Sequence, residues 1–164
     1  STQRKVDIIS LHPWHESALR QWLTDSMFPF NQVRVWNDLR LDLGLWPMLL
    51  YKWYDECVVE PQRWRGRLDS IVSELNDSAM SNRWLGAFGL GSDPEADRFF
   101  RTFGDIGAAS VEELSGLIDG FSDEDVKRLM TWAEMLAIGR RAVHGKLELD
   151  SVVNTILNPR RTAS

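Results

Sequence analysis

Residues 122–141 constrain the fold most, because three independent helix signals agree over this one segment. Ser122 is a preferred N-cap residue, and three carboxylates follow at 123–125, where the helix dipole favours negative charge. Arg140 and Arg141 stand near the expected far end, where positive charge is favoured. Between the two ends runs an apolar stripe at helical spacing: Val126, Leu129, Met130, Ala133, Leu136 and Ala137.

Helix start signals recur along the chain. Residues 92–95 and 110–113 each place a glutamate three positions after a serine, which is the pattern of a capping box. Pro13 and Pro61 are interpreted as first-turn prolines, each followed by an apolar run at helical spacing. These runs are Ala18, Leu19, Trp22 and Leu23 after Pro13, and Trp64, Leu68, Ile71, Val72 and Leu75 after Pro61. With a short last helix at 151–157, we predict a mainly α fold, a helical bundle of about six to seven helices.

Residues 32–45 fit two periods at once. Val33, Trp36, Leu39 and Leu43 have helical spacing, whereas every second residue from Leu39 to Leu45 is a leucine, as in a half-buried strand. Gly44 and Pro47 interrupt the backbone, so we expect two helices, one on each side of this break, with the strand as the alternative. Residues 5–11 and 146–149 also suit strands. The alternatives of one small β-hairpin, or of short strands near the N-terminus, are therefore kept beside the helical fold.

The chain of 164 residues has the usual size of one domain, and we predict a single helical domain over 1–164. Its two halves differ in character. Residues 1–90 are rich in tryptophan, 91–164 are acidic and well capped, and the basic tail 158–164 is expected to fray. The net charge of −5 disfavours binding to free nucleic acid, because an acidic surface repels phosphate.

Cys57 is the only cysteine, which excludes an intramolecular disulfide and fits a reducing compartment. The most apolar stretch, 45–54, falls short of the roughly 20 residues that span a bilayer. The N-terminus lacks the apolar run of a secretory signal. We therefore expect a cytoplasmic protein without membrane association.

No motif with strong catalytic or metal-binding character is present. His12 and His15 have a spacing that suits one metal ion, but no third ligand of a known motif follows them. The glycine run at 86–91 lacks the order of a phosphate-binding loop and is interpreted as a loop or hinge. Cys57 with His144 lacks any local signature of a nucleophile and base. We predict no metal, no cofactor and no catalytic residue.

The eight tryptophans are the strongest functional hint, and seven of them precede residue 90. A small core does not readily bury so many large rings, and tryptophan is enriched at interface hot spots. The alternative, to which we give equal weight, is that the tryptophans fill the core between the helices. Trp46 and Trp53 are seven residues apart and share a helix face with Leu49 and Leu50, so we predict these four residues as an exposed partner-binding surface.

A basic cluster at Arg63, Arg65 and Arg67 surrounds Trp64. On a helix, Arg63 and Arg67 share a face, which favours contact with a phosphate or an acidic partner. Solvated arginines whose stems cover the tryptophan are the simpler interpretation.

The leading hypothesis is a non-catalytic interaction protein, that is, an adaptor, assembly chaperone or small complex subunit, whose partner is another protein or a second copy of the chain. One alternative is an accessory subunit that contacts RNA or DNA through Arg63, Arg65 and Arg67. The other is an enzyme or small-molecule binder with an aromatic-lined pocket, since catalytic groups assemble in space without a linear signature.

Overall fold

The computed structural model describes residues 12–159 and confirms the mainly α fold. These residues form nine α-helices, more than the six to seven expected, three short 3-10 turns and one two-stranded antiparallel sheet. The helices are α1 (Glu16–Asp25), α2 (Val33–Leu43), α3 (Pro47–Cys57), α4 (Trp64–Leu75), α5 (Ser81–Ala87), α6 (Pro94–Ile106), α7 (Val111–Leu117), α8 (Asp123–Met135) and α9 (Ser151–Leu157). The strands are β1 (Gly139–Arg141) and β2 (Leu147–Leu149).

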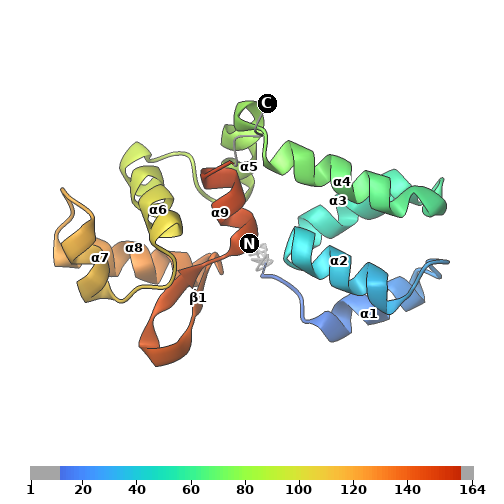
Figure 1. Ribbon diagram of the computed structural model, residues 1–164, viewed down its shortest axis with the longest axis horizontal. Coiled ribbons are helices and arrows are strands. Elements are labelled where there is room, and N and C mark those ends of the chain that lie inside the picture. The colour runs from blue at the N-terminus through green and yellow to red at the C-terminus, as the bar shows by residue number, and fades with distance from the viewer. Residues whose placement is uncertain (1–11, 160–164) are drawn as a thin grey trace, which may run out of the picture.

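Helix α9 lies between two groups of elements (Figure 1). The helices α1 to α4 pack against one another on one side, and α6, α7, α8 and the hairpin gather on the other. Helix α9 contacts α4, α5 and α6 and buries Val152, Val153, Ile156 and Leu157. The last helix of the chain thereby joins both groups to one connected apolar core.

The ambiguous segment 32–45 is helical over Val33–Leu43, so the strand alternative is wrong here. Leu39 and Leu43 are fully buried on one face of α2, whereas Leu41 between them is 65% exposed. Gly44 ends the helix in the left-handed conformation at φ 60°, and its N–H donates to the carbonyl of Arg40. Pro47 then opens α3 at a first-turn position. The two expected helices on either side of this break are confirmed.

The predicted caps are mostly confirmed. Ser110 and Glu113 form the reciprocal capping box of α7, and the hydroxyl of Ser122 accepts the N–H of Asp125 at the start of α8. The box expected at 92–95 is wrong by one residue, because Asp93 caps α6 directly before Pro94. Helix α1 begins only at Glu16, so Pro13 is not a first-turn proline.

The end of α8 differs from the expectation. The helix stops at Met135, and Ala137 takes a positive φ of 58°, which turns the chain into the hairpin. Arg140 and Arg141 therefore lie on β1, which pairs antiparallel with β2, and not near the end of a helix. The candidate strand at 146–149 is present as β2 over Leu147–Leu149, so the small sheet lies near the C-terminus. The candidate strand at 5–11 and most of the tail at 158–164 lie outside the described residues.

Candidate functional site

The predicted exposed surface on α3 is wrong. Trp46 is 2% exposed and Trp53 is fully buried, as are Leu49 and Leu50. Both indole N–H groups have acceptors inside the protein: Trp46 donates to Asp150 at 3.2 Å and Trp53 to the carbonyl of Trp64 at 3.0 Å. The four residues do share a helix face, as expected, but this face is turned into the core.

The arginine cluster is divided among acidic neighbours. Arg65 pairs with Asp38, Asp42 and Asp69 at 3.0, 3.3 and 2.9 Å, and Arg63 pairs with Glu60 at 3.2 Å. The Nε of Arg67 is buried and has no hydrogen-bond partner among the described residues. Three carboxylates surround one guanidinium, so the local charge at Arg65 is negative and gives no support to the binding of phosphate.

An aromatic face, defined by Trp14, Trp22, Tyr51 and Tyr54, gathers side chains from α1, α3 and the segment before α1. Trp14, Trp22 and Tyr51 contact one another pairwise in edge-to-face geometry, with ring centroids 5.5–5.7 Å apart. Tyr51 is 48% exposed and the other three rings are partly buried. Such packing holds the rings in place and leaves Tyr51 the most exposed of the four.

Acidic and aliphatic side chains border this face. Asp55 lies one helical turn after Tyr51, and Asp25 lies three residues after Trp22, so each carboxylate shares a side of its helix with a ring. Both are exposed, and neither belongs to an ion pair within residues 12–159. Val58 and Val59, also exposed, follow at the end of α3.

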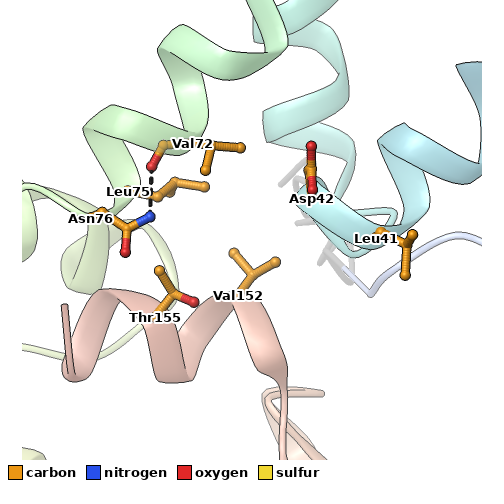
Figure 2. Close-up of a pocket in the computed structure, with 7 residues that line it drawn as sticks. All are labelled: Leu41, Asp42, Val72, Leu75, Asn76, Val152 and Thr155. Atoms are coloured by element: carbon orange, nitrogen blue, oxygen red, sulfur yellow. Dashed lines mark hydrogen bonds between the residues drawn. The ribbon is translucent and has the colours of Figure 1, made fainter. Parts of the chain in front are cut away.

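A half-open cavity of about 200 Å³ lies between α2, α4 and α9 (Figure 2). Asp42 stands on one side, and Asn76 and Thr155 stand across from it. Its lining residues are Leu41, Asp42, Val72, Leu75, Asn76, Val152 and Thr155. Sequence reasoning missed this site, because its walls come from three helices far apart in the chain.

Two oxygen atoms in the cavity lining, Asp42 Oδ2 and Asn76 Oδ1, are buried and accept no hydrogen bond within residues 12–159, although Arg65 Nη1 lies 3.3 Å from Asp42 Oδ2. The amide nitrogen of Asn76 donates to the carbonyl of Val72 at 2.9 Å, and the hydroxyl of Thr155 donates to that of Ser151 at 3.0 Å. Burial raises the pKa of the Asp42 carboxyl above its ordinary value, although the nearby Arg65 opposes this shift. The polar part of the lining therefore offers hydrogen-bond acceptors.

A second cavity, of about 300 Å³, adjoins the first at Leu41. It is lined by Pro13, Trp14, Arg40, Leu41, Gly44, Leu45, Arg140, Asp150 and Ser151. Asp150 is only 2% exposed and accepts from Trp46 and from the N–H groups of Val152 and Val153. Burial raises the pKa of its carboxyl. These hydrogen bonds all come from within the protein, so Asp150 is assigned a role in stabilising the fold.

The described residues show no assembled catalytic centre of the kind considered above. Cys57 is fully buried, and burial raises the pKa of its thiol to about 12, which leaves almost no thiolate at neutral pH. His144 lies in the turn between β1 and β2, on the far side of α9 from the Cys57 helix (Figure 1). Within residues 12–159, no group of three or more His, Cys, Asp or Glu side chains is arranged to hold a metal ion.

Comparisons with protein-family models, with curated proteins and with solved structures found no match to this chain. No helix in the part of the chain that the structure describes is long and apolar enough to cross a membrane.

Proposed function

We propose that the protein is a non-catalytic interaction module whose aromatic face binds a basic, apolar-containing segment of another protein. The observation that carries this proposal is the edge-to-face packing of Trp14, Trp22 and Tyr51 at the surface, bordered by Asp25 and Asp55. A reducing compartment such as the cytoplasm belongs to the same proposal, because the single cysteine of the sequence leaves no intramolecular disulfide to form.

The fixed rings favour binding because little conformational entropy is lost when a partner covers them. Each ring of the triad contacts the other two, so the face is organised before a partner arrives. Tyrosine and tryptophan offer a large apolar area together with a polar edge, and they are enriched among residues that dominate binding energy. An aliphatic side chain of the partner would pack on Tyr51 and on Val58, which lies four residues after Tyr54 at the end of α3.

The charge of the border selects the partner. Asp25 and Asp55 form no ion pair among the described residues, and the whole chain carries a net charge of −5. Asp25 accepts a hydrogen bond from Gln21 at 2.7 Å, but neither carboxylate is neutralised by a cation within residues 12–159. Lysine or arginine side chains of a partner would therefore meet carboxylates without an ion pair, and they would also meet the electron-rich faces of the rings. An acidic partner, including a second copy of this acidic chain, would be repelled.

Site-specific photo-crosslinking in cells tests the proposal, with a benzoylphenylalanine at Tyr51 and, as control, at Leu117, which is 62% exposed on α7. We expect a product from position 51 and not from 117, with the crosslink inside a Lys/Arg-rich, apolar-containing segment. The product should be lost with Asp55→Lys and retained with Asp105→Lys, an equal charge change at an exposed residue of α6.

Three outcomes would overturn the proposal. They are a product that joins two copies of the chain, a crosslink inside an acidic segment or a nucleic acid, and equal products from positions 51 and 117. An equal loss with Asp55→Lys and Asp105→Lys would contradict the assigned role of the acidic border. Circular dichroism of each variant separates these results from misfolding.

A further inference from the structure

The geometry points to a second binding site: we propose that the cavity between α2, α4 and α9 takes a short aliphatic diamine. One ammonium group would bind Asp42, and the other would bind Asn76 Oδ1 and the lone pairs of Thr155 Oγ1. The site is independent of the aromatic face, because the two share no residue.

The hydrogen-bonding character of the lining selects a ligand that donates. Asp42 Oδ2 and Asn76 Oδ1 are both acceptors, and both are buried without a hydrogen bond among the described residues. The hydroxyl proton of Thr155 is used on the carbonyl of Ser151, so its oxygen is left to accept. A buried acceptor without a donor costs about 1–3 kcal/mol, and an ammonium group has three N–H donors to offer.

The charge around Asp42 selects a cation. Arg65 is the one basic group shared by Asp38, Asp42 and Asp69, and its Nη1 lies 3.3 Å from Asp42 Oδ2. The three carboxylates and the one guanidinium leave a local excess of negative charge. An ammonium group placed at Asp42 would reduce this excess at a partly buried position, where screening by solvent is weak.

The shape of the cavity selects an aliphatic body. Leu41, Val72, Leu75 and Val152 provide the apolar walls, and the acceptors stand at opposite sides of the space between them (Figure 2). The volume of about 200 Å³ exceeds that of an engineered cavity of about 150 Å³ that holds benzene. A short aliphatic chain with an amine at each end therefore suits both the size and the polarity of the site, and 1,4-diaminobutane is the probe of that class.

Calorimetric titration of the full chain with 1,4-diaminobutane tests this inference, with butylamine and 1,4-butanediol as matched ligands. We expect saturable binding of the diamine, binding at least about tenfold weaker for butylamine, and none for the diol. A ligand that binds only the folded chain also raises the melting temperature, so thermal unfolding gives a second readout.

Two cavity variants and one control locate the site. Asp42→Asn should weaken diamine binding at least about tenfold. Asp69→Asn removes the same charge from the same Arg65 cluster but lies outside the cavity, so it should weaken binding clearly less than Asp42→Asn does. Thr155→Val keeps the shape of the side chain while it removes an acceptor, and it should weaken the diamine without changing the binding of butylamine.

The inference is overturned if the wild type shows no saturable diamine binding, or if the diol or butylamine binds as tightly as the diamine. It is also overturned if Asp42→Asn and Asp69→Asn weaken binding equally, since that result assigns the effect to general charge. Should Asp42→Asn fail to fold, Thr155→Val decides alone, and unchanged diamine binding by that variant rejects the site.

Discussion

Trp46 donates its indole N–H to the carboxylate of Asp150 across 3.2 Å, although 104 positions separate the two residues in the chain. Trp46 is the N-cap residue of α3 and Asp150 that of α9. The same carboxylate oxygen accepts the N–H groups of Val152 and Val153. One buried acidic group thus caps the last helix and also binds it to the tryptophan-rich half of the molecule.

We predict that Trp46→Phe destabilises the protein by about 1–3 kcal/mol, because it removes a donor from a buried carboxylate and leaves a small void. Urea unfolding followed by circular dichroism measures the change. Trp36→Phe is the matched control, since the indole of Trp36 donates to Asn31 only five residues away at a half-buried position. An equal loss of stability in the two variants would show that the hydrogen bond from Trp46 to Asp150 contributes no more to the free energy of unfolding than the local bond from Trp36 to Asn31.

The raised pKa of Asp150 gives a prediction about pH. Between the ordinary carboxyl pKa and the raised value, the folded protein keeps a proton that the unfolded chain has released. Stability from this group therefore falls as the pH rises through that interval. Asp150→Asn has no such proton, while its amide oxygen still accepts from Trp46 and the α9 backbone. The free energy of unfolding of the variant minus that of the wild type should increase with pH, and a flat or falling difference would contradict the prediction.

Local signals in the sequence predicted local structure well, and the reason is physical. A capping serine and its glutamate act over three residues, so Ser110 and Ser122 identified two helix starts without knowledge of the fold. The end of α8 could not be read this way. Ala137 takes a left-handed conformation that its residue type does not favour, and the hairpin packing decides it.

The candidate sites were harder to predict because they depend on which helix face meets the core. Spacing places Trp46 and Trp53 on one face, but it does not say whether that face is covered. Tyr51 and Tyr54 are three residues apart, and this spacing was a signal for the aromatic face that the sequence offered. Their contacts with Trp22, however, form only when α1 packs on α3. The cavity similarly needs α2, α4 and α9 together.

Gly104 marks a close approach of α6 and α9. A Cβ on Gly104 would lie 2.0 Å from Asn154 Oδ1 and 2.8 Å from its Cγ. Asn154 also donates to the carbonyl of Gly104 at 3.2 Å, so its displacement would break a contact between the helices. We predict that Gly104→Ala destabilises the protein by about 1–3 kcal/mol, although alanine is the better helix former.

Gly66 in α4 is the control for that substitution. A Cβ there would meet no atom within 4 Å, and the backbone is helical, so only the intrinsic preference changes. Gly66→Ala should therefore stabilise the protein by about 0.5–1 kcal/mol. Urea unfolding of the two variants should give shifts of opposite sign. Stabilisation by Gly104→Ala would mean that α9 moves away from α6 at little cost.

The buried thiol of Cys57 provides a probe of unfolding. It is fully buried in α3, and burial raises its pKa to about 12, so both access and ionisation oppose its reaction at neutral pH. We predict that the native protein resists an aromatic disulfide reagent and that the labelling rate rises with urea together with the unfolded fraction.

A double variant, Cys57→Ala with Val59→Cys, is the positive control, because residue 59 is 85% exposed just beyond α3. It should react at once without urea. Rapid, stoichiometric labelling of the wild type under native conditions would contradict the buried position of the thiol. Labelling that is complete in urea well below the unfolding transition would instead show that α3 opens locally, because the rate then reports a smaller free energy than global unfolding.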